Sequence, residues 1–139
     1  MSEKEIYFDL AVRYLKASKE EFLKEDTKIE VSAFCVYHAY ENIACATISH
    51  FNRVVPTRTH AKKLRTFYAV IKNDKNFKTL RTTINALNYQ FLNMRNQALY
   101  PQTTDEQNFD HPKVFFAKDK IKELQKRVEG IINKVEKII

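Results

Sequence analysis

The sequence predicts an all-α protein, an antiparallel up-and-down four-helix bundle with one additional short helix. The chain has one glycine and three prolines in 139 residues, too few for the many tight turns of a β-sandwich or barrel. Apolar residues recur at helical spacing along most of the chain. There is no internal repeat and no break in composition, so residues 1–139 are predicted to form a single domain.

The first two helices each have a capping signal. Ser2 and Glu5 have the spacing of a capping box, and apolar residues at helical spacing follow as far as Phe22. Thr27 and Glu30 repeat that spacing and predict a second helix that runs to about residue 50. The second helix is apolar on nearly every face, which indicates the most buried element of the bundle.

A connection containing Pro56 separates the second helix from a short helix expected over residues 60–71. A turn at 73–76, with Asn76 as the N-cap, leads into a fourth helix that must end before Pro101. The fourth helix has a regular apolar stripe, made of Leu80, Ile84, Leu87, Phe91, Met94 and Ala98.

The segment 101–110 is polar and is interpreted as a loop. Asp110 or His111 is expected to cap the last helix, with Pro112 in its first turn. The last helix has a heptad seam, made of Ala117, Ile121, Leu124, Val128, Ile131, Val135 and Ile138. This seam fits packing inside the bundle, and dimerisation through it is the alternative.

Two features bear on where the protein resides. Cys35 and Cys45 lie ten residues apart on one predicted helix, about 15 Å along its axis, so they are not expected to form a disulfide. No apolar run reaches the roughly 20 residues of a membrane span, and the first residues do not have the pattern of a secretory signal. We therefore expect a cytoplasmic protein that does not enter a membrane.

The net charge of +7 comes from one segment. Residues 53–81 contain nine basic residues against one acidic residue, whereas the remainder has fifteen basic and sixteen acidic residues. Such a segment suits a polyanion, with RNA or DNA as the first candidate, and a solvated face that only adds solubility is the alternative. The predicted nucleic-acid contacts are Arg58, Lys62, Lys63 and Arg65.

Two charged residues are isolated in apolar helices. Glu41 is the only charged residue between Val31 and His50, and Arg95 is the only one between Arg81 and Asp105. A lone ion on a buried helix is costly unless it is paired. We therefore hypothesise that Glu41 and Arg95 face each other, with Tyr37, Asn42 or Asn88 nearby. On the residues alone, a purely structural pair is favoured.

The segment from Arg95 to Pro101, together with the number and order of the helices, resembles the HEPN superfamily of small helical bundles. The motif of that family is an Arg, usually followed by a polar residue, with a His four to six residues further on. Arg95 and Asn96 match its beginning, whereas Tyr100 stands in the first position allowed for the His. The resemblance covers nearly the whole chain, and the motif itself is short.

The resemblance implies a metal-independent endoribonuclease, in which the RNA 2′-hydroxyl attacks the adjacent phosphate. Arg95 would stabilise charge on that phosphate, Asn96 would hold Arg95 or the substrate, and Glu41 would orient the guanidinium. Tyr100 is a poor proton shuttle at neutral pH, because tyrosine has a pKa of about 10, so cleavage is expected to be weak or lost. A homodimer is implied, as is a role in prokaryotic defence, toxin–antitoxin or stress systems, beside a separately encoded nucleotidyltransferase or antitoxin.

Other functions remain open at this point. The main alternative is a non-catalytic module that dimerises or docks a partner, with Glu41 and Arg95 as a structural pair, and a weaker one is a small-ligand pocket near Arg95. His38, Glu41 and Cys45 share one helix face but are not interpreted as a metal site, since a satisfied core histidine is commoner. His50 and His60 flank the basic connection and are interpreted as exposed, with phosphate contact as the alternative. No cofactor is predicted.

Overall fold

The structure, a computed structural model, describes the backbone of residues 1–99, 102–103, 109–110 and 116–139, and the side chains of residues 1–94 and 116–139. The described elements are α1 (Glu3–Phe22), α2 (Ile29–His50), α3 (His60–Ile71), the 3₁₀ turn η1 (Lys75–Phe77), α4 (Arg81–Leu99), β1 (Gln102–Thr103), β2 (Phe109–Asp110) and α5 (Lys118–Ile138). The predicted all-α bundle with an extra short helix is confirmed.

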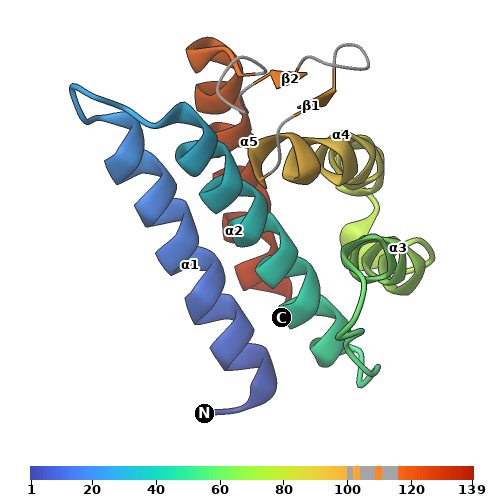
Figure 1. Cartoon of the computed structure of the whole chain (residues 1–139). Coiled ribbons are helices and arrows are strands. Elements are labelled where there is room, and N and C mark those ends of the chain that lie inside the picture. The colour runs from blue at the N-terminus through green and yellow to red at the C-terminus, as the bar shows by residue number, and fades with distance from the viewer. Residues whose placement is uncertain (100–101, 104–108, 111–115) are drawn as a thin grey trace.

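Helix α2 is the centre of the bundle. It packs against α1, α3, α4 and α5, whereas α1 packs mainly on α2 and more lightly on α5. Figure 1 shows α1 and α2 running antiparallel beside each other with α5 behind them, while α3 and α4 lie on the opposite side of α2 and cross it. Most of α2 is buried, as its apolar composition predicts. In the described part of the chain, no helix combines the length and apolar character that a membrane span needs.

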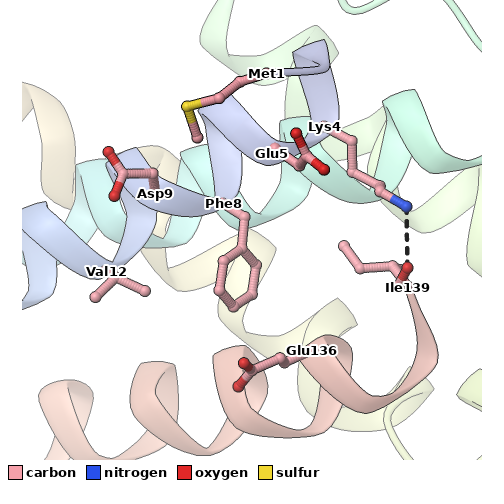
Figure 2. A pocket seen from close by; sticks show the side chains of 8 residues that line it. All are labelled: Met1, Lys4, Glu5, Phe8, Asp9, Val12, Glu136 and Ile139. Atoms are coloured by element: carbon pink, nitrogen blue, oxygen red, sulfur yellow. Dashed lines mark hydrogen bonds between the residues drawn. The ribbon is translucent and has the colours of Figure 1, made fainter.

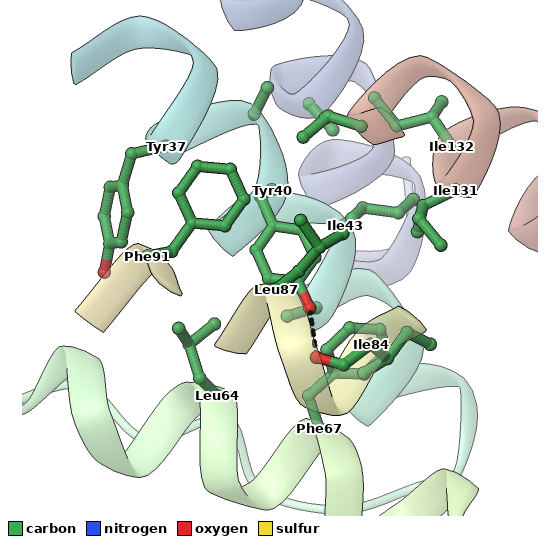
Figure 3. Packing of buried hydrophobic residues seen from close by; sticks show 14 of the residues in the cluster. Tyr37, Tyr40, Ile43, Leu64, Phe67, Ile84, Leu87, Phe91, Ile131 and Ile132 are labelled. Atoms are coloured by element: carbon green, nitrogen blue, oxygen red, sulfur yellow. Dashed lines mark hydrogen bonds between the residues drawn. The ribbon is translucent and has the colours of Figure 1, made fainter. Parts of the chain in front are cut away.

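Aromatic side chains form the core between α2, α3 and α4. Tyr40 of α2 stacks on Phe91 of α4 with 4.8 Å between ring centroids, and Phe67 of α3 meets the Tyr40 ring edge-on (Figure 3). The Tyr40 hydroxyl donates to Asn88 Oδ1 at 2.7 Å, and the Asn88 amide donates to the Leu64 carbonyl at 2.8 Å. These bonds satisfy the buried polar atoms and join the three helices.

A neutral polar contact joins α1, α2 and α5. Ser18 and Ser32 each donate their hydroxyl to the backbone carbonyl of the other at 2.8 Å. The buried Gln125 amide of α5 donates to Ser18 Oγ at 2.9 Å and to Ser32 Oγ at 3.2 Å. Small side chains allow α1 and α2 to approach closely here, and the hydrogen bonds fix their register.

The cap predicted for α1 is confirmed, and the cap predicted for α2 is wrong. Ser2 and Glu5 form both hydrogen bonds of a capping box. Thr27 instead donates its hydroxyl to the Phe22 carbonyl at 3.0 Å, so it serves the C-terminal end of α1, and Lys28 is the N-cap of α2 without a side-chain cap. A threonine between two helices can cap the N–H groups of the second helix or donate to the last carbonyls of the first. Here its hydroxyl donates to the carbonyls at the end of α1.

The predicted starts of two later elements are also wrong. Asp74, rather than Asn76, caps the turn before α4, because its carboxylate accepts the Asn76 N–H at 2.8 Å. The last helix begins at Lys118, since Asp110 lies in β2 and pairs with Gln102 of β1, and Ala117 has extended backbone angles. Residues 102–103 and 109–110, predicted as loop, therefore form a short antiparallel pair, while His111 and Pro112 lie outside the described residues.

The apolar seam of the last helix packs inside the bundle. Ile121, Leu124, Val128, Ile131 and Val135 are all buried within the single chain. The interpretation of this seam as internal packing is confirmed, and its buried residues do not form an exposed dimerisation surface.

Candidate functional site

The isolated carboxylate of Glu41 lies at the centre of a polar cluster between α2 and α3. Glu41 is only 4% exposed. Its Oε1 accepts from Lys63 Nζ at 3.0 Å, and its Oε2 lies 2.6 Å from His60 Nδ1. The Tyr37 hydroxyl also donates to Oε2. The expectation that this lone charge needs a partner is confirmed, and its described partners are Lys63, His60 and Tyr37.

Helical spacing explains why these side chains meet. Tyr37 and Glu41 are four residues apart on α2 and therefore lie one above the other on the same face. On α3, His60 extends by one turn the buried stripe of Leu64, Phe67 and Ile71. Because these apolar residues are buried, this face of α3 points toward the core. His60 and Lys63, in the first turn of α3, therefore lie next to the Glu41 carboxylate.

The electrostatics of the cluster keep Glu41 and Lys63 charged. Burial alone would raise the pKa of the Glu41 carboxyl, but hydrogen bonds from Tyr37, Lys63 and His60, with the charge of Lys63, outweigh it and lower the pKa. Burial would lower the pKa of Lys63, and its hydrogen bond and ion pair with Glu41 raise it instead. The cluster therefore contains a buried ion pair at neutral pH.

Two further titratable groups lie within reach of the Lys63 charge. Burial raises the pKa of the Tyr7 phenol on α1, and burial raises the pKa of the Cys45 thiol to about 12. Both groups are therefore protonated at neutral pH. Cys45 is a buried thiol rather than a nucleophile, because only the thiolate reacts readily.

The four predicted nucleic-acid contacts divide into two kinds. Arg58, Lys62 and Arg65 are exposed, and none of the ion pairs found among the described residues includes them. Lys63 is turned inward, with 18% of its side chain exposed, and binds Glu41. Three of the four predicted contacts are thus exposed cations outside the described ion pairs, and the fourth is held by Glu41.

The charge of the first turn of α3 opposes the helix dipole. This turn contains Lys62 and Lys63 and no acidic residue, and Thr59 at the N-cap makes no side-chain cap. Anions stabilise a helix N-terminus by about 0.3–1 kcal/mol each, and cations there are unfavourable. Glu41 compensates Lys63, but no described residue compensates Lys62, so the helix tolerates a cation at a position where stability alone would not place it.

The remaining predicted site residues are described only in part. Arg95 and Asn96 belong to the last turns of α4, but their side chains lie outside the described residues, as does Tyr100 altogether. Arg95 follows Phe91 by one helical turn, and the Phe91 ring lies 5.9 Å from the Tyr37 ring. The α4 backbone thus approaches the Glu41 side of α2, and a contact between Glu41 and Arg95 stays a prediction.

The other residues expected near Glu41 have different partners. Asn42 donates to the His38 carbonyl of its own helix, and Asn88 binds Tyr40 and Leu64. The His38 ring stacks on Tyr14 and meets Phe34 edge-on. Among the residues whose structure is described, no group of three His, Cys, Asp or Glu is placed to hold a metal ion.

Two hollows lie beside the bundle rather than at the cluster. One of about 510 Å³ lies between the start of α1 and the connection after α2, with Tyr7 and Arg53 among its lining residues. The other, of about 470 Å³, lies between the first half of α1 and the end of α5, where Phe8 points toward α5 (Figure 2). Neither is lined by Glu41, so these two hollows do not support a small-ligand pocket at the cluster.

Sequence reasoning missed His60 and the inward role of Lys63. The signal was present, since His60 continues the stripe of Leu64, Phe67 and Ile71 at spacings of four, three and four residues. Lys63 was concealed by the cations around it, because a lysine among other basic residues gives no sign that it is the one turned inward.

Comparisons of the chain with models of protein families, with curated proteins and with solved structures found no match. The resemblance to HEPN domains therefore depends on the helix order and on the residues from Arg95 to Pro101.

Proposed function

We propose that this chain is a HEPN-like, RNA-associated protein that binds the phosphate backbone with the α3 side of the bundle and retains metal-independent RNA cleavage in weakened form. The observation that carries the proposal is the set of exposed cations in α3 and just before it. Arg58, Lys62 and Arg65 lie in a segment with one acidic residue against nine basic ones. Cations without described partners gain most from a polyanion, because each phosphate contact releases condensed counterions.

The resemblance supplies the chemical part of the proposal. Arg95 would stabilise the charge that develops on the phosphate, Asn96 would hold Arg95 or the substrate, and Tyr100 would bind phosphate or a nucleotide in place of the usual His. Two copies of the chain would meet at the site, and the setting would be a prokaryotic defence, toxin–antitoxin or stress system in the cytoplasm.

The binding part is tested with the full-length protein and a fluorescein-labelled single-stranded RNA. Arg58, Lys62 and Arg65 are changed together to Gln, and the matched control changes the exposed Lys118, Lys120 and Lys134 of α5 to Gln. We expect the α3 variant to bind at least tenfold more weakly in anisotropy titrations. The slope of the logarithm of the binding constant against the logarithm of the salt concentration should be shallower by about 0.7 for each phosphate that the variant no longer neutralises. Equal weakening in both variants would contradict a specific binding face.

The cleavage part is tested with total RNA in the presence and absence of a chelator. Cutting that survives the chelator and disappears in Arg95→Ala supports a metal-independent ribonuclease. An Arg95→Ala protein that loses thermal stability, from a parent that cuts no RNA, supports a structural Arg95 instead.

The second candidate is a non-catalytic module that docks a second copy, a nucleotidyltransferase or an antitoxin. The observation that favours it is that both Glu41 oxygens already have partners from α2 and α3. Such a cluster clamps α3 onto α2 without any ligand. In this case, neutralising the α3 cations leaves RNA binding unchanged, and light scattering of the purified protein with its partner reports the assembly.

A further inference from the structure

We propose that His60 is the general base that takes the proton of a ribose 2′-hydroxyl, and that Glu41 is the positioning residue that orients its imidazole. The inference builds on the proposed RNA association and assigns a proton acceptor that the motif around Arg95 does not contain.

The geometry of the pair determines which nitrogen is free. His60 Nδ1 lies 2.6 Å from Glu41 Oε2, and an ionised carboxylate only accepts hydrogen bonds, so Nδ1 must donate. In the neutral ring the second nitrogen, Nε2, then carries the lone pair. Among the described residues nothing hydrogen-bonds to Nε2, and 34% of the His60 side chain is exposed. A proton acceptor is therefore presented to a ligand at the surface.

The orientation of the imidazole is fixed by the buried residues that hold Glu41. The carboxylate that holds it is itself held by the Tyr37 hydroxyl and by Lys63. The Tyr37 ring also meets the His60 ring edge-on, with 6.1 Å between centroids. A base on the first turn of a helix, anchored to a buried carboxylate, has little freedom to turn away from its substrate.

A purely architectural cluster does not need a histidine here. Lys63 alone neutralises the charge of Glu41, and Tyr37 supplies a further hydrogen bond. A buried carboxylate that accepts from Nδ1 of a partly exposed imidazole is the arrangement that holds a histidine in the tautomer needed for proton abstraction. Arg58, two residues before His60 in the chain, is exposed and would contact the backbone of the same RNA.

The reaction balances without a metal or a co-reactant other than water. The 2′-oxygen forms a bond to the adjacent phosphorus as its proton passes to Nε2, and the bond from phosphorus to the 5′-oxygen of the next nucleotide breaks. The departing 5′-oxygen takes a proton from water, and the imidazolium returns its proton to the hydroxide that remains. The products are a 2′,3′-cyclic phosphate and a 5′-hydroxyl end.

The main experiment compares His60→Gln with the parent protein in single-turnover cleavage of a fluorescein-labelled single-stranded RNA. We expect the rate to fall by about 100-fold or more, the usual contribution of a general base. Affinity for the all-2′-deoxy strand of the same sequence, which cannot react, should stay within twofold. The matched control is His50→Gln, at the other end of the basic connection, and we expect it to cleave at the parent rate. Mass spectrometry of the parent reaction should show the cyclic phosphate.

Two further measurements separate catalysis from folding. Added imidazole should restore part of the cleavage by His60→Ala, which a structural role does not predict. Glu41→Gln should lower the single-turnover cleavage rate, while its affinity for the all-2′-deoxy strand stays within twofold, because the carboxylate orients the imidazole and does not contact the RNA. Among the described residues, the charged and titratable groups that face this pair are Tyr37 of α2 and Lys63 of α3, with Tyr7 and Cys45 beyond Lys63.

The outcomes distinguish this inference from the proposed function. A parent protein that binds RNA but never cleaves it overturns the role of His60 and leaves the RNA association standing. Cleavage by His60→Gln at the parent rate overturns it equally. A parent protein that binds no RNA overturns the proposed function and this inference with it.

Discussion

The two sides of α2 join their neighbouring helices by different chemistry. Toward α1 and α5, the buried polar contact is neutral and is made by Ser18, Ser32 and Gln125. Toward α3, the neutral hydrogen bonds of Tyr40 and Asn88 are joined by an ion pair with an imidazole beside it, made by Glu41, Lys63 and His60. All of these contacts fix a helix against α2, and among them only the Glu41 cluster contains charge.

This difference indicates where to look for function. A neutral hydrogen-bonded contact holds helices together with little desolvation cost. A buried ion pair costs more to desolvate and is often no more stabilising than a well-packed apolar pair. If the Glu41 cluster served only to hold α3 against α2, neutral hydrogen bonds of the kind seen elsewhere in this molecule would do so at a lower desolvation cost. The charged contact is therefore the better candidate for a site under functional selection.

The largest effect is expected from removing the carboxylate. Glu41→Leu leaves Lys63 and the Tyr37 hydroxyl without their shared partner, and breaking a buried pair from one side costs about 3–5 kcal/mol. The partial exposure of Lys63 places the expected loss near the lower end of that range. The free energy of unfolding in urea measures it.

A double variant tests whether the loss comes from the orphaned charge. Glu41→Leu with Lys63→Met replaces both ions by apolar groups and should recover most of the lost stability. If the double variant is as unstable as the single one, the cluster stabilises the fold through packing or through His60. The claim that charge distinguishes the α3 side of α2 is then wrong.

The second effect is the dependence of stability on pH that the Glu41–Lys63 pair contributes. The folded-state pKa of Glu41 is lowered, so its contribution is present above the unfolded value of 4.5 and is lost as the pH falls through the folded value. The folded-state pKa of Lys63 is raised, so its contribution is lost as the pH rises above 10.5. Urea unfolding at a series of pH values should show both losses in the parent protein, and the double variant should show a flatter curve.

The elements that depend on local sequence were largely predictable. The capping box at Ser2 and Glu5 and the apolar stripe of α5 involve residues close together in the chain, so spacing alone reveals them. Thr27 shows where local reasoning ends. Its hydroxyl lies between two helix ends, and only the folded structure determines that it donates to the carbonyls of Phe22 and Lys24 at the end of α1.

The sequence predicted that Glu41 has a partner in the candidate site, but it did not predict which residues its partners are. The isolation of Glu41 in an apolar helix correctly indicated that it needs a partner. The identity of that partner depends on which face of α3 meets α2, which is a tertiary property. Arg95 was the expected partner because it is equally isolated, whereas Lys63 lies among many cations and does not stand out. His60 could have been found by extending the apolar stripe of α3 backward by one turn.

The smallest effect is expected on the neutral side of α2. Gln125→Leu keeps the approximate volume of the buried side chain and removes two hydrogen bonds to serine hydroxyls. The hydroxyls of Ser18 and Ser32 still donate to each other's backbone carbonyls, so no buried donor is left without a partner. The substitution should therefore lower the free energy of unfolding by about 1 kcal/mol or less. This difference between variant and parent should be the same at every pH between about 4 and 10.

Gln125→Leu matches Glu41→Leu in kind, since each replaces one buried polar side chain by leucine. Equal destabilisation in the two variants would mean that charge adds nothing special on the α3 side, and a functional site there would have no energetic basis.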